Sequence, residues 1–526
     1  MLGIPNICAR RLLGVYVVLR SGPLTHHVDF VAAFQNHTNF SRKNMCSILE
    51  PLKDCSPTFE IFERLQKIVD AKARSGSFWF QFLDTCTELD RPMLANAAAD
   101  FVASAPFRHS KAAVMKVLEL FAAQSRFTEF RSLFDLLHSG LTAPEKVVFA
   151  LDLIRVLSQT PYYKETLNIL PLIEKRHRNN ALRYICEGAA KFDSTQSALT
   201  SLSELDTYHP PPTDSFFVEL LAKLPTKEGY SVMNSLLEII RTKHWIISES
   251  SAGMIASWFN SQDAQVYTAT MGIRIMGTMC PACKNKLPVF QMSEHAVTSI
   301  SKEFYQRAFK GEQDEHLYLT TTPKELDSLE KFLESQDDRF DCVIDFLNVM
   351  HQLCVPFEPK MAGRVMCEIL QTFKREFNFK RFCLVSKGNV VIRHPTFMAQ
   401  VKELGNKLGI SVFTFITQNK SEDDIFTIYI ALWSGPRCYL VSNDEFKQHR
   451  FIVGSQLGFQ IFRWQSIRQI GLSPGRHGTP LVPLQCDTCV HGCGDSGWHI
   501  PYDDKSPRKS YVPPNLWLCV RLLRPM

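Results

Sequence analysis

Four aspartates stand at the ends of apolar runs in the last third of the sequence, where their carboxylates could serve a metal ion. They are Asp345, Asp423, Asp424 and Asp444. Carboxylates gathered in one place repel one another unless cations neutralise them, and hard oxygen ligands suit Mg²⁺ or Mn²⁺. Two such ions can hold a phosphodiester, lower the pKa of an attacking water and stabilise the leaving oxygen. The set therefore predicts metal-dependent hydrolysis of a nucleic-acid backbone.

Each of these aspartates, taken alone, also fits a structural role. Asp423 and Asp424 could interact with the dipole of the helix that they begin, and Asn443 with Asp444 could form an ordinary turn. Glu422 should point off the face that its two neighbours use, so we expect it only to support the ligands. The metal interpretation depends on the whole set ending three strands of one sheet.

A second group of residues has the types and spacing of a zinc site. Cys280 and Cys283 form a C-x-x-C pair that offers two thiolates, so two further ligands are needed. One completion uses His499 and Cys519, which would tie two distant segments together. The other completion uses a local cluster, Cys486, Cys489, His491 and Cys493. Spacing alone does not choose between the two.

The aspartates lie in a region where short β-rich runs alternate with segments of helical period. We expect strands at 341–345, 382–386, 411–417, 438–442 and 459–463. An order of strand, helix, strand gives a parallel sheet, and ligands of such sheets bind beyond the carboxyl ends of the strands. The acidic strand ends are thereby brought to one edge.

Residues 77–260 show apolar patterns of helical period that are broken by short polar turns. Breaks near residues 77, 111, 146, 179, 214 and 250 give a unit of about 33 to 36 residues, which is long enough for two helices and two turns. Three interpretations fit: pentatricopeptide repeats that bind single-stranded RNA, tetratricopeptide repeats that bind peptides, or a generic helical bundle.

The composition is that of a folded chain with several domains. Of 526 residues, 45% are apolar and 21% are charged, and the net charge of +6 permits a phosphate-rich partner without requiring one. The apolar stretch 12–19 is far shorter than the roughly 20 residues of a spanning helix, so no membrane insertion is expected. Sixteen scattered cysteines fit a reducing compartment.

The first residues favour a mitochondrial address. Residues 1–28 contain three arginines and no acidic residue, interleaved with apolar side chains, as in a transit peptide. A secretory signal is less favoured because Arg20 ends the apolar run and no small-residue cleavage site follows; an ordinary basic tail is the remaining alternative. Polar residues 36–44 continue a loop-like composition, so we expect the fold to begin near residue 55.

Several stretches in the second half of the chain are more specific. They are FDCVID (340–345) with LNV (347–349), SEDD (421–424) running on to SG (434–435), WQ (464–465), GD (494–495), WHIPYD (498–503) and WLC (517–519). Together they resemble the protein-only RNase P family, in its animal mitochondrial branch. The resemblance covers most of the chain, and the repeats and the first residues agree with it.

The resemblance implies an α plus α/β architecture in four parts. Residues 1–40 would be a mitochondrial transit peptide and polar linker, and 55–262 pentatricopeptide-like helical repeats forming an α-solenoid. Residues 263–325 and 480–526 would form a central zinc-binding connector. Residues 326–479 would form an NYN/PIN-like metallonuclease domain, with a parallel β-sheet flanked by helices.

The resemblance also implies an activity and its site. Family members remove the 5′ leader of precursor tRNA with divalent metal and leave a 5′-phosphate on the tRNA. The Mg²⁺ or Mn²⁺ ligands of the family fall on the four aspartates, Asp345, Asp423, Asp424 and Asp444. Its Zn²⁺ ligands fall on Cys280, Cys283, His499 and Cys519, which favours the long-range completion. The enzyme would work in the mitochondrial matrix on mitochondrial precursor tRNAs.

The animal branch further implies two protein partners, a tRNA methyltransferase and a short-chain dehydrogenase. There are departures from the family pattern as well. Phe346 stands where the family usually has Gly, directly after the first aspartate. His394 could contact substrate, although a structural or exposed histidine is the more ordinary interpretation. The rival function is a non-catalytic pentatricopeptide RNA-binding protein of the organelle, and a scaffold of peptide-binding repeats would leave the acidic strand ends unexplained.

Overall fold

The computed structural model describes most of the chain. The described residues are 26–35, 40–51, 54–71, 77–174, 177–206, 210–224, 229–261, 266–275, 277–310, 321–353, 358–388, 390–418, 423–473, 479–483, 486–494 and 496–523. Residues 1–25, on which the expected transit peptide falls, lie outside these ranges. The chain divides into two compact units, Met1–Asp193 and Ser194–Met526.

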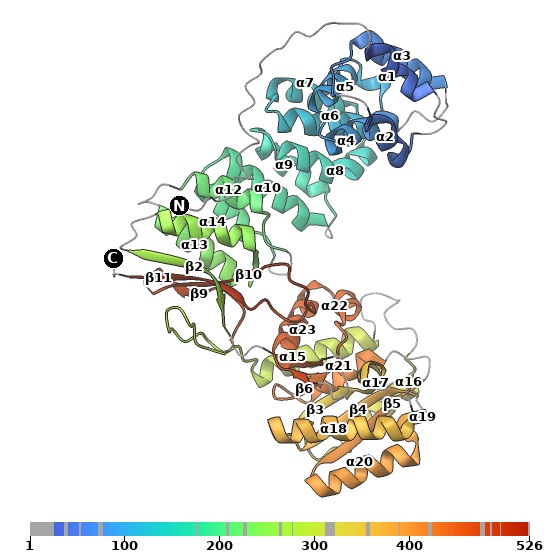
Figure 1. The fold of residues 1–526 in the computed structure, drawn as a ribbon, viewed down its shortest axis with the longest axis vertical. Helices are drawn as coiled ribbons and strands as arrows, with labels where there is room; N and C mark the ends of the chain where they lie inside the picture. Colours follow the sequence, from blue (N-terminus) through green and yellow to red (C-terminus); the bar gives the residue numbers. More distant parts are fainter. Residues whose placement is uncertain are drawn as a thin grey trace. The chain divides into compact units, whose positions relative to one another are not determined.

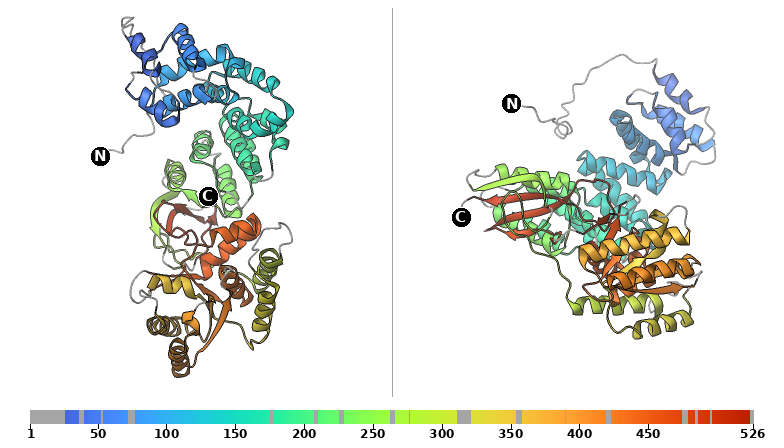
Figure 2. Two further views of the ribbon diagram at one scale, coloured as in Figure 1. Left: turned by 90° about the vertical axis from the view of Figure 1, so that its right-hand side faces the viewer. Right: turned by 60° about the horizontal axis from the view of Figure 1, so that its bottom comes forward.

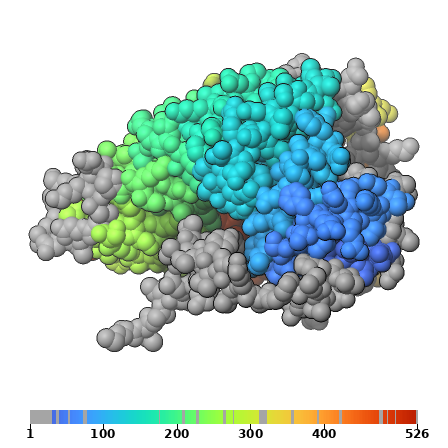
Figure 3. Space-filling view, turned by 90° about the horizontal axis from the view of Figure 1, so that it is seen from above, coloured from blue at the N-terminus to red at the C-terminus, as the bar shows by residue number. Residues whose placement is uncertain are grey.

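The described part of the first unit is helical (Figure 1). Its helices are α1 (His26–Gln35), α2 (Arg42–Leu49), α3 (Phe59–Ala71), α4 (Phe78–Glu88), α5 (Pro92–Ser104), α6 (Lys111–Ala123), α7 (Phe127–Gly140), α8 (Ala143–Leu157), α9 (Thr166–Ile169) and α10 (Arg178–Phe192), with the 3₁₀ turns η3 (Pro106–Arg108), η4 (Tyr163–Glu165) and η5 (Leu170–Leu172). The blue-to-cyan atoms of this unit form a continuous surface in the space-filling view (Figure 3).

Local sequence signals set where these helices begin. The Ser110 hydroxyl accepts a hydrogen bond from the Ala113 backbone N–H at 3.3 Å and caps α6. The Thr142 backbone N–H donates to Glu145 Oε2 at 3.0 Å at the start of α8. Helices α4, α6, α8 and α10 start within a few residues of the breaks expected near 77, 111, 146 and 179. The helical period was therefore a sound guide to the elements.

The fold begins earlier than the expected position near residue 55. Helices α1 and α2 precede it, and Phe30 and Phe34 of α1 are buried in an aromatic cluster with Phe78 and Phe82 of α4. The polar stretch 36–44, expected to be a linker, includes the start of α2, which Ser41 caps by accepting from the Asn44 N–H. A polar N-cap was thus mistaken for loop composition.

The second unit begins with helices and a small sheet. The helices are α11 (Thr195–Ser203), α12 (Asp214–Ala222), α13 (Gly229–Thr242) and α14 (Glu249–Ser261), and the strands are β1 (Ile247–Ser248), β2 (Tyr267–Arg274), β9 (His491–Cys493), β10 (Gly497–Asp503) and β11 (Leu516–Leu522). The strand order is β1-β10-β11-β2, and β9 pairs with β10. Helix α14 packs on this sheet, which the green helices cover in Figure 2. Segments far apart in the sequence are thereby joined in one sheet.

The larger sheet of the second unit has the order β5-β4-β3-β6-β7-β8. Its strands are β3 (Cys342–Asp345), β4 (Arg381–Lys387), β5 (Ser411–Thr417), β6 (Tyr439–Val441), β7 (Gln469–Leu472) and β8 (Pro480–Leu481). All neighbours pair in parallel except β7 with β8. The expected parallel sheet is present, and the α plus α/β class is confirmed.

Helices cover both faces of this sheet. They are α15 (Glu294–Tyr305) with the π-helical turn η7 (Gln306–Lys310), α16 (Pro323–Glu334), α17 (Phe346–Leu353), α18 (Pro359–Phe377), α19 (Val390–Arg393), α20 (Pro395–Leu408), α21 (Asp423–Trp433), α22 (Lys447–Ile452) and α23 (Ser455–Arg468). Along β3 the side chains alternate: Val343 packs with α15, α16, α21 and α23, whereas Cys342 and Ile344 pack with α18 and α20. The sheet is therefore buried on both sides, as parallel sheets are.

Two expectations about this region were wrong in detail. Residues 459–463, expected to be a strand, lie within α23, because Leu457, Ile461 and Trp464 form a buried stripe at helical spacing. Helix α15, expected in the connector, packs into the core of the larger sheet through Val297 and Phe304. Within the described ranges, no helix reaches the length and apolarity that crossing a membrane requires.

Candidate functional site

The larger sheet brings the predicted aspartates to one edge. Asp345 is the last residue of β3, Asp423 and Asp424 begin α21 after β5, and Asp444 lies three residues beyond the end of β6. Because β3 pairs in parallel with both β4 and β6, the carboxyl ends of these strands lie at the same edge. The structure thus places all four carboxylates where ligands of parallel sheets bind.

Asp345 is the most buried of the four. It is 3% exposed, its Oδ2 accepts a hydrogen bond from Ser442 Oγ at 2.8 Å, and its Oδ1 accepts from the Asn348 N–H at 3.2 Å. Burial, together with the negative charges of Asp423 and Asp444, raises the pKa of Asp345 to about 7, although the two hydrogen bonds act in the opposite direction. A nearby cation would therefore be needed to keep this carboxylate ionised at neutral pH.

Asp423 and Asp444 are partly exposed and tied to the backbone around them. The Lys387 N–H, at the end of β4, donates to Asp423 Oδ2 at 3.1 Å. Asp444 Oδ1 accepts from the Phe446 N–H at 2.9 Å, so this residue does form the local turn that its sequence suggested. Each of the two aspartates uses one carboxylate oxygen in these contacts.

His449 is a residue of this edge that the sequence analysis did not identify. It lies on the short helix α22, is buried, and places Nε2 3.8 Å from Asp424 Oδ2. The only sequence signal is a histidine five residues after Asp444, which is not distinctive by itself. A protonated His449 would form an ion pair with Asp424, and a neutral one would leave that carboxylate available to a cation.

Polar side chains beneath the aspartates fix the loop after β6. The Asn443 N–H donates to Asn348 Oδ1 at 2.9 Å, and Asn443 exchanges two hydrogen bonds with the backbone of Leu472, at 2.7 and 2.8 Å. Gln469 Nε2 donates to the carbonyl oxygens of Ser442 and Asp444 at 2.8 and 2.7 Å. These contacts hold the backbone of Asp444 on strand β7, although sequence reasoning had no means of finding them.

The acidic edge has the donor chemistry of a Mg²⁺ or Mn²⁺ site. All four candidate ligands are carboxylate oxygens, which are hard donors, and none is a sulfur atom. Mg²⁺ usually keeps several water ligands and binds through one or two carboxylates, so the carboxylates need not touch. The pKa of Asp345 is raised chiefly by burial, and the neighbouring carboxylates Asp423 and Asp444 add to the shift. The residues present therefore fit this kind of ion.

The predicted cysteine and histidine set converges at the smaller sheet. The ligand atoms of Cys280, Cys283, His499 and Cys519 all lie within 4.8 Å of one another. His499 and Cys519 are register partners on β10 and β11, and His499 Nε2 lies 3.1 Å from Cys283 Sγ and 3.7 Å from Cys519 Sγ. In the described part of the chain, no other group of three or more Cys, His, Asp or Glu residues meets this criterion.

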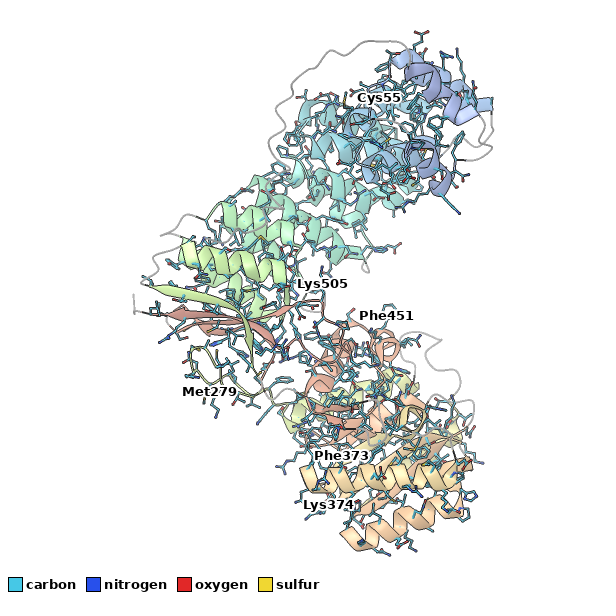
Figure 4. All side chains as sticks on the ribbon, viewed as in Figure 1. Cys55, Met279, Phe373, Lys374, Phe451 and Lys505 are labelled. Carbon is cyan, nitrogen blue, oxygen red and sulfur yellow. The ribbon has the colours of Figure 1, made fainter. Side chains whose placement is uncertain are left out.

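A tight turn supplies the two cysteines of the C-x-x-C pair. The Cys280 N–H donates to the Asn285 carbonyl and the Lys284 N–H donates to the Cys280 carbonyl, both at 2.9 Å. Lys284 has a φ of 65°, in the left-handed region that such a turn requires. Met279, labelled in Figure 4, stands on the same loop directly before the first cysteine.

The electrostatics of this set suit Zn²⁺. Burial lowers the pKa of His499 to about 4, so its imidazole is neutral and able to bind a metal at neutral pH. Burial raises the pKa of the Cys283 and Cys519 thiols, so a bound cation would be needed to deprotonate them. Three sulfurs and one imidazole nitrogen in a buried, closed arrangement are the ligands of a structural tetrahedral zinc site.

The local alternative does not form such a set. Cys489 Sγ lies 3.8 Å from His491 Nε2, but that nitrogen is 2.6 Å from the Asp487 carbonyl, and Cys493 is exposed with its Sγ 3.2 Å from Ser496 Oγ. Two other predicted positions can be placed as well. His394 caps α20 by accepting from the Thr396 N–H at 3.3 Å, a structural role, and Glu422 lies outside the described residues.

Comparison with known proteins gives a consistent picture. The Protein-only RNase P family model matches residues 275–519. The chain is 25% identical to the "Mitochondrial ribonuclease P catalytic subunit" of Rattus norvegicus, over 78% of the chain and 69% of that protein, and 24% identical to its namesake from Mus musculus, over 78% and 70%. The crystal structure of nuclear proteinaceous RNase P 2 from A. thaliana has a similar fold, with a TM-score of 0.54 and 16% identity over 84% of this chain and 98% of that one.

Proposed function

We propose that this chain, which belongs to the protein-only RNase P family, is an endoribonuclease that removes the 5′ leader from precursor tRNA. The observation that carries the proposal is the acidic edge of the larger sheet, where Asp345, Asp423, Asp424 and Asp444 end or follow parallel strands. All four aspartates, and all four residues of the cysteine and histidine set, fall inside the matched range 275–519.

The aspartates would hold one or two Mg²⁺ or Mn²⁺ ions. When bound, such ions neutralise the scissile phosphate, activate a water and stabilise the leaving oxygen. The chain itself positions the ligands: Ser442 and Asn348 orient Asp345, Lys387 orients Asp423, and Gln469 holds the backbone of Asp444. His449 lies beside Asp424 and would help to position that carboxylate. The negative charge of Asp424 would favour the protonated form of His449.

The cysteine and histidine set would hold a structural Zn²⁺ that joins distant segments. Cys280 and Cys283 come from the loop after β2, and His499 and Cys519 come from the last two strands. A zinc ion there would lock the loop onto the smaller sheet and make its folding depend on the metal. We therefore keep the name zinc-binding connector for this part, with its boundary placed before α15.

The helix pairs would form pentatricopeptide-like repeats that bind the tRNA. The period of about 33 to 36 residues fits both kinds of repeat, and the family match of residues 275–519 supports this choice over peptide-binding repeats. The larger sheet and the helices that cover it would form an NYN/PIN-like metallonuclease domain. In this proposal, the helical repeats bind the RNA and the acidic edge of the larger sheet hydrolyses it.

The names of the mammalian relatives support a mitochondrial location. We propose the matrix, where precursor tRNAs would be processed, and assistance by a tRNA methyltransferase and a short-chain dehydrogenase. If assistance is needed, the purified chain alone should cleave poorly and the two added proteins should raise its rate. Full activity of the chain alone would contradict this part of the proposal.

The test is a cleavage assay on a mitochondrial precursor tRNA with Mg²⁺, with and without the two candidate partners. We expect wild type to release the leader and Asp424→Asn to lose at least about a hundredfold in rate while still binding the tRNA. Asp327→Asn is the matched control, because Asp327 is an exposed aspartate of α16 paired with Lys331. It should cleave like wild type.

The same assay separates the rival function. A non-catalytic RNA-binding protein would bind the precursor in every lane and release the leader in none. Phe346, which replaces the usual family glycine, was the feature that favoured this rival, but its side chain is fully buried against Phe397 and belongs to the core. Loss of cleavage in the Asp327→Asn control would show that the assay measures folding rather than the acidic edge.

A further inference from the structure

A pocket of about 450 Å³ lies in the second unit, on the side of the smaller sheet that carries the cysteine and histidine set. Four residues with basic side chains line it: Arg241, Lys286, His491 and His499. The other polar lining side chains are Asn285 and Ser496. None of the described lining residues is an Asp or a Glu. The function proposed above does not use this pocket.

Two cationic side chains of the pocket, Arg241 and Lys286, come from different segments of the chain. Arg241, at the end of α13, is held in place because its Nη1 donates to the Gly492 carbonyl at 3.1 Å and its Nη2 pairs with Glu238. Lys286 comes from the cysteine turn and is exposed. Among the described residues near these side chains, Glu238 pairs with Arg241, and Asp487 pairs with Arg463 at 3.1 Å.

His499 gives the pocket a further donor. Both of its sulfur contacts are made by Nε2, which leaves Nδ1 as the protonated nitrogen when Nε2 binds a metal. A metal-bound histidine usually donates this second N–H to a carboxylate, carbonyl or water. Within the described part of the chain, Nδ1 of His499 makes no hydrogen bond to another residue, and His499 lines the pocket.

The size and chemistry of the pocket select its ligand. Its volume is in the range of small-ligand sites, but among the described lining residues the apolar side chains are Leu287 and Pro288, with no Phe, Tyr or Trp ring on which a base could stack. Cationic side chains and N–H donors without carboxylates suit a phosphate group. An RNA chain bound at the acidic edge of the larger sheet would carry many phosphate groups.

We propose that this pocket binds a backbone phosphate of the RNA substrate. The inference rests on the proposed function for the identity of the RNA, and it adds a contact from the zinc-binding connector to those of the repeats and the acidic edge. A free phosphate compound has the same chemistry, so the experiment separates the two sources.

The test compares two lysines of the same turn. Lys286→Gln removes a charge inside the pocket, and Lys284→Gln removes the same charge two residues away, from an exposed lysine that does not line it. Ser496→Asp adds a carboxylate to the pocket without removing a cation. All variants are made in the Asp424→Asn background, so that the RNA stays whole, and zinc content is measured to show that the connector is folded.

Dissociation constants for precursor tRNA are measured between 50 and 200 mM KCl. We expect Lys286→Gln to weaken binding about three- to tenfold and to reduce the slope of log K against log salt by roughly 0.7 to 0.9, the value of one lost phosphate contact. Ser496→Asp should weaken binding more, and Lys284→Gln should stay within about twofold of its parent. In parallel, inorganic phosphate and AMP are tested for thermal stabilisation of each variant.

Each other outcome overturns the proposal. An equal loss in Lys284→Gln would mean that only general surface charge matters. Unchanged RNA binding, with phosphate or AMP protection lost only in Lys286→Gln, would assign the pocket to a small phosphate compound, and no effect in either arm would leave it without a phosphate ligand. Cleavage by wild type is scored separately, so a failed nuclease and a failed pocket are distinguishable.

Discussion

Asp345 shows how burying a carboxylate among other carboxylates costs stability at the residue scale. Its pKa is raised to about 7 in the folded chain, against an ordinary value near 4 when unfolded. The folded state therefore binds a proton more tightly, and the stability that this gives at low pH is lost as the pH rises through about 7. Burial of the carboxylate, with two other carboxylates nearby, is the cause.

This predicts that Asp345→Asn stabilises the metal-free protein at high pH. At pH 8 without Mg²⁺, the variant should exceed wild type by roughly 2 to 4 kcal/mol of unfolding free energy, and at about pH 3.5, below both pKa values of Asp345, the two should be nearly equal. Asn can keep both contacts, since its carbonyl accepts and its amide can donate to Ser442. Thermal unfolding at the two pH values measures the difference. An equal gain at both would show that ionisation of Asp345 is not the cause.

Phe346 is a second residue whose environment gives a definite expectation. It begins α17 directly after Asp345, is fully buried, and its ring lies 5.3 Å from that of Phe397 in an edge-to-face arrangement. Phe346→Ala should therefore lower the free energy of unfolding by about 3 to 5 kcal/mol, measured by denaturant titration. Phe451 on α22 is the control because its side chain is 87% exposed (Figure 4). Phe451→Ala should change the free energy of unfolding little.

At the scale of elements, the smaller sheet depends on ligands from distant segments. We predict that Cys519→Ser lowers bound zinc from about one ion per chain to nearly none, because a hydroxyl is a poor replacement for a thiolate. Cys493→Ser is the matched control, since Cys493 is an exposed cysteine on the neighbouring strand β9. Metal analysis after gel filtration reports both. Zinc lost from Cys493→Ser instead would favour the local cluster.

The elements also show what the sequence could and could not predict. Asp345 could be placed because a short apolar run that ends in a carboxylate is a local pattern. The helix over 459–463 was missed because a short apolar run fits a buried strand as well, and only tertiary packing decides. Cys280 lies near Cys519 because β2, which precedes the cysteine loop, pairs with β11, and spacing in the sequence does not encode this pairing. His449 gave no signal because its closeness to Asp424 depends on how α22 packs.

A further contact between elements links the two sheets of the second unit. Arg463 of α23 pairs with Asp487 at 3.1 Å, and its guanidinium lies 3.8 Å from the ring centre of Phe290. Phe290 and Asp487 lie beside the smaller sheet, whereas α23 covers the larger one. Since arginine combines a planar ion pair with ring stacking, lysine would not replace both contacts. The segment beside the smaller sheet and helix α23 of the larger sheet are thus joined by specific side chains and not by the chain alone.

At the scale of the whole molecule, two metal requirements should be separable. The acidic edge offers hard oxygen ligands and would exchange Mg²⁺ readily, whereas the buried sulfur ligands of the smaller sheet would hold Zn²⁺ tightly. Removing Mg²⁺ should stop cleavage without lowering the unfolding temperature of the connector, and adding it back should restore the rate at once. A zinc-selective chelator should instead unfold the connector, because binding of a structural zinc is coupled to folding. Excess Mg²⁺ should not rescue the zinc-free protein, but Zn²⁺ added during refolding should. Cleavage rate and thermal unfolding, measured on the same samples, test both halves; full activity in a chain shown by metal analysis to lack zinc would contradict the structural role.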